Sequence, residues 1–204
     1  MEEVADCANV LTLIESFEDA ENFYAVTRYM NGGSLFDYIT KQPSQPLQED
    51  TAQEIIRQIA TGLKGLHEKD IVHRDIKIDN ILVNSSNSGE IKFYVADLGS
   101  GAKLAFEDTA SFMIGTRGYV APEILKGDDY SKEVDIFSLG CLMHALLSAK
   151  LPFWTESKRE QNLRVVKEAF NTESNAHIAS LSAEAKNLLA SMLAKEPSQR
   201  PSVE

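Results

Sequence analysis

Apolar and polar positions follow strand-like or helix-like periods over most of the chain. Apolar-rich runs at 10–17 and 23–30, separated by the polar stretch 18–22, predict two antiparallel strands joined by a five-residue loop. Shorter apolar runs at 81–83 and 91–96 predict two more strands. The strands therefore lie in the first half of the chain and are few.

Helical periodicity dominates elsewhere. From 48 to 69 the apolar residues recur at the spacing of one buried helix face, and Ser34 is placed to cap a short helix that runs to about Lys41. Residues 134–149 are apolar on nearly all sides, which predicts a buried helix. Two further amphipathic helices are expected at 162–170 and 183–194. The pattern predicts an α+β protein: a helical domain with a small β element at its front.

Composition limits the classes of protein that need considering. The 204 residues, 43% of them hydrophobic, suffice for one domain with a core, and the net charge of −11 argues against nucleic acid or an anionic membrane as the main partner. The only cysteines, Cys7 and Cys141, form no disulfide framework or metal-ligand spacing. With no signal peptide and no apolar run of membrane-spanning length, we expect an intracellular protein of the cytoplasm or nucleus.

Charged residues lie between apolar neighbours in one short stretch, H-R-D-I-K-I-D-N at 73–80. Burying such charges is costly unless they have a partner or a task. A strand that ends in D-L-G at 97–99 follows, and A-P-E comes at 121–123. In order, spacing and context, these motifs resemble the catalytic loop, the metal-binding motif and the end of the activation segment of eukaryotic protein kinases. The resemblance covers essentially the entire chain.

The resemblance implies a role for each residue of these motifs. Asp75 would accept and orient the substrate hydroxyl, Lys77 would lie near the transferring γ-phosphate, and Thr116 would bond both of them as a third catalytic residue. Asn80 and Asp97 would hold Mg²⁺, which shares the phosphates of ATP. ATP and Mg²⁺ are therefore the expected cofactors.

The form of the loop indicates which hydroxyl receives the phosphate. A lysine two residues after the aspartate, together with Thr116 in G-T-R-G-Y-V-A-P-E, resembles the Ser/Thr class of these enzymes. Protein substrates with serine or threonine acceptors are thus the expected partners.

Nucleotide contacts are expected where the second strand ends. By register in the family, Thr27 would lie at the back of the nucleotide pocket, the backbone of Arg28 to Met30 would bond adenine, and Leu82 would lie beneath the ring. Without the resemblance, Thr27 is equally well read as an inward residue of a half-buried strand.

Other matching positions are expected to be structural. His73 would pack near the D-L-G motif, Asp135 would hold the catalytic-loop backbone, and Arg200 would pair with Glu123. Leu98 replaces the usual phenylalanine but keeps an apolar side chain.

The resemblance also implies a division of the chain. Residues 1–30 would be a remnant of the small lobe, with two strands that lead to the hinge, and 31–204 would be the helical lobe, so the fold is expected to be mainly that α-helical C-terminal lobe with a residual β-hairpin. No G-x-G-x-x-G-x-V loop and no V-A-I-K lysine occur in the sequence. We therefore expect a domain incomplete at both ends, prone to aggregate and weakly active or inactive alone.

The sequence also suggests one mode of regulation and two alternatives to an active protein kinase. A phosphate on Thr109 or Ser111 could pair with Arg74 and order the activation segment. A catalytically inactive kinase-like module that binds partners or regulates them is an alternative to the enzyme. A small-molecule kinase is a third possibility, which the A-P-E and G-T motifs disfavour.

Overall fold

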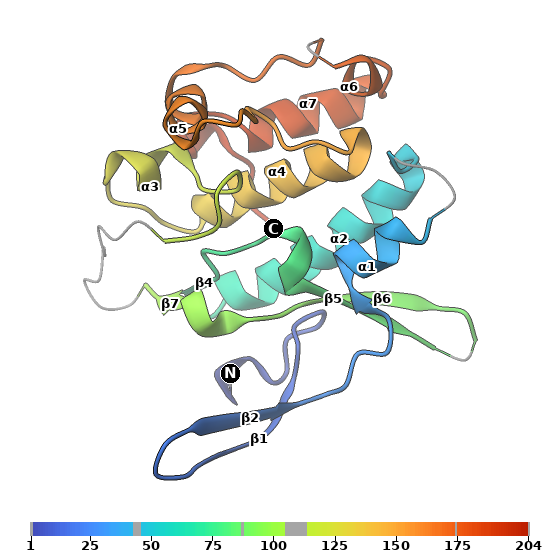
Figure 1. The fold of residues 1–204 in the computed structure, drawn as a ribbon, viewed down its shortest axis with the longest axis vertical. Helices are drawn as coiled ribbons and strands as arrows, with labels where there is room; N and C mark the ends of the chain where they lie inside the picture. The colour runs from blue at the N-terminus through green and yellow to red at the C-terminus, as the bar shows by residue number, and fades with distance from the viewer. Residues whose placement is uncertain (1, 43–45, 87, 105–113, 174, 204) are drawn as a thin grey trace.

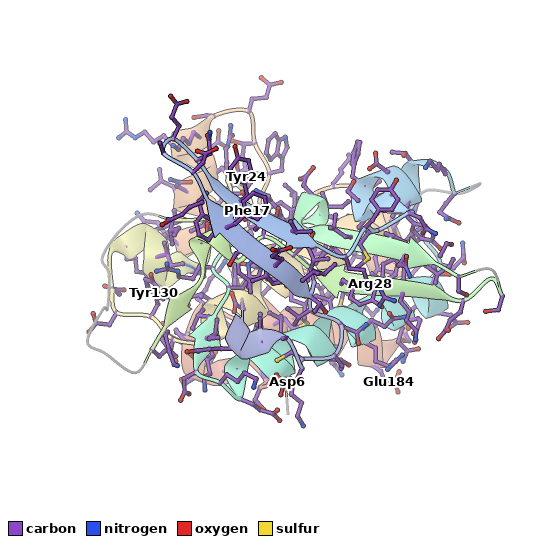
Figure 2. All side chains as sticks on the ribbon, turned by 90° about the horizontal axis from the view of Figure 1, so that it is seen from below. Asp6, Phe17, Tyr24, Arg28, Tyr130 and Glu184 are labelled. Atoms are coloured by element: carbon purple, nitrogen blue, oxygen red, sulfur yellow. The ribbon has the colours of Figure 1, made fainter. Side chains whose placement is uncertain are left out.

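The computed structural model describes residues 2–42, 46–86, 88–104, 114–173 and 175–203. At one end lies a hairpin of β1 (Leu13–Glu18) and β2 (Phe23–Thr27), paired antiparallel and set away from the helices (Figure 1). The predicted hairpin is confirmed, with strands shorter than the apolar runs. Its side chains are mostly exposed, and Phe17 stacks on Tyr24 on one face of the ribbon (Figure 2).

A second sheet lies between the hairpin and the helices. Its antiparallel order is β3 (Gly33–Ser34), β5 (Ile81–Ser85) and β6 (Ile91–Val95), which confirms the two predicted later strands. A separate pair joins β4 (Ile71–Val72) to β7 (Ala102–Lys103). This pair brings the segment that follows residue 70 beside the segment that ends at Lys103.

Helices α1 (Leu35–Thr40) and α2 (Glu49–His67) follow the hairpin along the chain, as predicted. Ser34 caps α1: its hydroxyl accepts from the Asp37 amide, and the Asp37 carboxylate accepts from the Ser34 amide. Helix α2 packs one apolar face against β6 and against α4 (Glu133–Ser148).

Helix α4 forms the centre of the helical region and is buried on nearly all sides, as its sequence predicts. Helix α7 (Ala183–Met192) packs closely on it at Gly140, where a Cβ would lie 2.9 Å from the Met192 Cβ. Helix α5 (Lys158–Lys167) begins and ends earlier than the predicted 162–170, because the Ser157 hydroxyl accepts from the Glu160 amide and starts the helix there.

Several short elements were not predicted, since they contain too few residues to show a period. They are α3 (Pro122–Lys126), α6 (Ala176–Ala179) and the 3₁₀ turns Glu2–Val4, Ile78–Asn80, Leu98–Ser100 and Pro197–Gln199. Among all the helices of the described ranges, none is both long and apolar enough to cross a membrane.

Candidate active site

Helix α4 holds the loop that follows β4 through one fully buried carboxylate. Asp135 Oδ2 accepts a 2.8 Å hydrogen bond from the His73 amide, and Oδ1 accepts one of 2.8 Å from the Arg74 amide. His67 Nε2 lies 2.9 Å from the same Oδ2. Arg74 has a positive φ of 67°, an uncommon conformation for a side-chain-bearing residue, and these bonds hold it there. The expected structural role of Asp135 is confirmed.

His73 connects this loop to the end of β6. Its Nδ1 accepts from the Asp75 amide at 3.2 Å, so the ring proton is on Nε2, which donates to the Ala96 carbonyl at 2.9 Å. Ala96 directly precedes Asp97. The expected position of His73 beside the D-L-G motif is confirmed.

Asp75 lies at the centre of a group of polar side chains from two segments, 75–80 and the segment that carries Thr116. Thr116 Oγ1 donates to its Oδ1 at 2.7 Å, and Lys77 Nζ donates to its Oδ2 at 2.7 Å. Lys77 Nζ also lies 2.8 Å from Thr116 Oγ1, so the three side chains close a triangle. Asn80 Nδ2 donates to Asp75 Oδ2 at 3.0 Å and to the Asp75 carbonyl at 2.9 Å.

These donors decide the ionisation of Asp75. Burial raises the pKa of its carboxyl, but the hydrogen bonds from Lys77, Thr116 and Asn80 and the charge of Lys77 outweigh the burial, so its pKa lies below the ordinary value. Asp75 is therefore a carboxylate at neutral pH.

Asn80 and Asp97 lie at the same end of the β5–β6 pair. Ile81 stands opposite Val95, and the Ala96 amide donates to the Asn80 carbonyl at 2.9 Å, so the residues that flank this pair are neighbours. Asp97 is exposed, has a left-handed φ of 62°, and its Oδ1 accepts from the Gly99 amide at 3.3 Å.

The donor set at this edge fits a hard cation. The Asn80 amide nitrogen is used on Asp75, which leaves its side-chain oxygen available as a ligand, and Asp97 follows the strand that pairs beside Asn80. Among the described residues no three His, Cys, Asp or Glu side chains gather as a metal cage. Mg²⁺ is usually bound by only a few protein oxygens, and phosphates and water supply its other ligands. The oxygens of Asn80 and Asp97 suit such an ion.

The segment 114–123 brings Thr116 to this site. Gly115 has a φ of +100°, and a Cβ there would lie 2.9 Å from the Arg74 carbonyl, so only glycine allows this approach. At the far end of the segment, Arg200 makes a buried two-bond ion pair with Glu123, at 2.6 and 2.8 Å. The expected pairing of these two residues is confirmed.

The residues expected to contact the nucleotide lie at the end of β2, in the segment that follows it and in β5. Met30 is buried in a small apolar cluster with Leu11 and Ala96, and Leu82 packs against it. Thr27 is half-buried at the end of β2. Arg28 is exposed, and its amide donates to the Thr12 carbonyl at 3.3 Å. The structure thus brings Met30 and Leu82 together beside the residue that precedes Asp97.

The sequence did not reveal the partners of Arg74. Its guanidinium donates to the carbonyls of Ser100 and Gly101, at 2.6 and 3.3 Å, and to the Tyr130 hydroxyl at 2.9 Å. The phosphorylation candidates Thr109 and Ser111 lie outside the described residues. No periodicity or motif marked Tyr130, because its contact joins segments far apart in the chain.

A family model described as "Protein kinase domain" matches residues 1–204. The chain belongs to the protein kinase family. Within the family, the chain is similar to serine/threonine kinases. It is 34% identical to the "Calcium and calcium/calmodulin-dependent serine/threonine-protein kinase" of Lilium longiflorum, over 98% of this chain and 38% of that one.

Two other relatives are also serine/threonine kinases by name. The chain is 36% identical to the "Serine/threonine-protein kinase PLK2" of Mus musculus, over 96% of this chain and 27% of that one. It is 32% identical to the "Serine/threonine-protein kinase PLK4" of Drosophila virilis, over 96% of this chain and 24% of that one. This kinase domain therefore spans about a quarter to two-fifths of the length of these relatives.

Proposed function

We propose that this kinase domain transfers the γ-phosphoryl group of ATP to serine and threonine hydroxyls of protein substrates. The observation that carries the proposal is the closed triangle of Asp75, Lys77 and Thr116, because it holds a carboxylate and a cation around one point. Phosphoryl transfer depends mainly on such positioning and on charge stabilisation.

Each residue of the triangle has a task in this reaction. Asp75, ionised at neutral pH, would accept the hydrogen bond of the substrate hydroxyl, orient its oxygen toward phosphorus and take its proton. Lys77 would place its ammonium charge against the transferring phosphoryl group. Thr116 would hold both side chains at a fixed distance, since its hydroxyl contacts each of them.

Asn80 and Asp97 would hold Mg²⁺ through side-chain oxygens at the end of the β5–β6 pair. When bound there, the ion would neutralise charge on the phosphates. Thr27, the backbone of Arg28 to Met30, and Leu82 would contact the adenine ring. The apolar cluster of Met30 and Leu82 supports this, because an aromatic base binds best between apolar side chains.

We also propose the division and location that the sequence predicts. Residues 1–30 would belong to the small lobe and 31–204 to the helical lobe; the position of the hairpin away from the helices supports this boundary. The cytoplasm or nucleus would be the compartment, which agrees with the free thiols of Cys7 and Cys141.

Phosphoamino-acid analysis tests the proposal. The full-length protein that the gene encodes is incubated with labelled ATP, Mg²⁺ and a mixture of peptides that carry Ser, Thr or Tyr as the only acceptor. We expect label on Ser and Thr, and its loss when Mg²⁺ is chelated or when Asp97 is changed to Ala. Label on Tyr alone, or none on any peptide, would overturn the proposal.

A further inference from the structure

Strand β6 lies at the end of its sheet: β5 pairs with one of its edges, and no strand of the described ranges pairs along the other. The backbone groups on this open edge are nevertheless bonded, because groups from α2 and from the segment before β1 take the place of a strand. The edge is of interest because Asp97 follows two residues after the last residue of β6.

Gln58 of α2 occupies the first half of the open edge. Its Oε1 accepts from the Phe93 amide at 2.9 Å, and its Nε2 donates to the Ile91 carbonyl at 3.3 Å. A carbonyl and an amide two residues apart are the pair that one residue of a neighbouring parallel strand would bond. The side-chain amide of Gln58 therefore acts as a strand residue.

Asn9 and Leu11 occupy the half of the edge that leads to Asp97. The Asn9 side-chain amide donates to the Phe93 carbonyl at 2.8 Å, and the Val95 amide donates to the Asn9 carbonyl at 2.8 Å. The Leu11 amide then donates to the Val95 carbonyl at 2.8 Å. The open edge is thus bonded from one end of β6 to the other.

Gln58 and Asn9 also fix each other. Asn9 Nδ2 lies 3.2 Å from Gln58 Oε1, and Gln58 Nε2 also donates to Glu54 Oε1 at 2.7 Å. Gln58 is buried, and both acceptor positions and both donor positions of its amide are used. An amide in this state has one orientation, because any rotation would leave buried polar groups without partners.

The backbone is built for this approach of Asn9 to the strand. Its φ of 56° is left-handed, a conformation in which asparagine is enriched. Gly62 of α2 faces it, and a Cβ at that position would lie 2.6 Å from the Asn9 carbonyl oxygen. A larger residue than glycine would push the segment away from the edge of β6.

The Asp97 carboxylate depends on its backbone for its position. It is exposed, and among the described residues it accepts one long bond of 3.3 Å, from a backbone amide in the turn that follows. The chain just before it is held on both sides, by the bonds of Val95 to the segment 9–11 and by the bond of the Ala96 amide to the Asn80 carbonyl. The groups that hold the edge of β6 therefore also hold Asp97.

We propose that Gln58 and Asn9 are positioning residues for the metal site: by closing the open edge of β6, they hold the Asp97 carboxylate in the position from which it would bind Mg²⁺ together with Asn80. Removing a group that orients a metal ligand commonly lowers metal affinity by about 10- to 100-fold. The inference rests on the proposed function, since it concerns the same Mg²⁺ site.

Nucleotide binding with and without Mg²⁺ tests the inference in the absence of turnover. The probe is ADP with a fluorescent label on its ribose, bound to the full-length protein. The ratio of its affinity in Mg²⁺ to its affinity in EDTA measures the contribution of the metal.

Two variants open the edge in different ways. Gln58→Met keeps the length of the side chain and removes its bonds to β6, and Asn9→Gly removes the side chain but tolerates the left-handed backbone. Each should lower the affinity ratio about three- to tenfold, while the affinity in EDTA stays within about twofold of the wild type. An unchanged ratio in both variants would overturn the inference.

A loss of stability alone is tested separately. Ile178→Ala removes a fully buried side chain of α6, which packs on α4, and should destabilise the protein without changing the ratio. An equal fall of the ratio in this variant would contradict the inference, because the effect would then follow stability. Hydrogen exchange of the amides of 91–97 should be faster in the Gln58 and Asn9 variants; faster exchange with an unchanged ratio would assign them a structural role alone.

Asp97→Ala separates this inference from the proposed function. The variant should abolish the effect of Mg²⁺ on ADP affinity. If it keeps the effect, the proposed metal-binding role of Asp97 fails. If it loses the effect while the Gln58 and Asn9 variants keep it, the positioning role alone is overturned.

Discussion

Thr116 donates a 2.7 Å hydrogen bond to Asp75, a residue 41 positions earlier in the chain. The bond joins the activation segment to the catalytic loop, and Lys77 Nζ contacts both partners. The geometry of the loop therefore depends on the position of the segment, which is the kind of coupling that an enzyme with a movable segment requires.

Removing this hydroxyl should weaken phosphotransfer without unfolding the protein. Thr116→Val keeps the shape of the side chain but takes one donor from Asp75 and one contact from Lys77, so we expect kcat to fall about tenfold or more. Thr116→Ser keeps the hydroxyl and should retain most of the rate. Equal rates for the Val and Ser variants, measured with a Ser or Thr peptide, would show that the hydroxyl has no role.

Asp135 should contribute strongly to the stability of the fold. It is fully buried and accepts from the His73 and Arg74 amides, so Asp135→Asn would turn an amide N–H toward a donor. We expect the free energy of unfolding to fall by about 2–4 kcal/mol. Urea denaturation measures this free energy. Asp128→Asn, a substitution at an exposed site, is the control and should change the free energy of unfolding by less than about 0.5 kcal/mol.

The pair of Glu123 and Arg200 should show the asymmetry of a buried ion pair. Either Glu123→Gln or Arg200→Met alone leaves a buried charge uncompensated, and should lower the free energy of unfolding by about 3–5 kcal/mol. The double variant should lose clearly less than the sum of the two single variants. The exposed pair of Glu3 and Lys103 serves as a control, where the corresponding loss should be far smaller because solvent screens both charges. Additive losses at the buried pair would contradict the account.

Lys195 should make stability depend on alkaline pH. Its ammonium nitrogen is buried with no hydrogen-bond partner among the described residues, and lies 3.7 Å from the centre of the Phe153 ring. Burial lowers the pKa of Lys195 from its ordinary 10.5 to about 8.

Between these two values the unfolded chain binds more protons than the folded one, so the free energy of unfolding should rise with pH. At pH 7 the Lys195→Met variant should be more stable than the wild type by about 1–3 kcal/mol, and the gap should close as the pH approaches 10.5. Urea titrations at pH 7, 9 and 10 measure it. A gap that stays constant over this range would contradict the assignment.

Periodicity predicted the elements that are long enough to show it. The hairpin, β5, β6, α2, α4 and α7 were predicted because each has at least one apolar face. The short α3 and α6 were not, and the start of α5 was placed too late because the cap at Ser157 determines it and apolar spacing does not. Apolar periodicity thus predicted most of the helices and strands that hold the candidate active site.

The site itself was predictable only as far as local motifs reach. Asp75, Lys77, Asn80 and Asp97 fall within two short stretches, and the resemblance of these stretches to protein-kinase motifs grouped them. The contact of Arg74 with Tyr130 arises where segments distant in the chain meet, and no local pattern encodes such a contact.

The most direct measurement of the central claim is phosphotransfer by the Asp75→Asn variant of the full-length protein. Asn keeps the size of the side chain and can still accept from Thr116, but it cannot take the proton of the substrate hydroxyl. We predict that kcat with a Ser or Thr substrate falls about a hundred- to ten-thousand-fold, while the circular-dichroism spectrum and ATP affinity stay those of the wild type. A rate within a few-fold of the wild type would contradict the account.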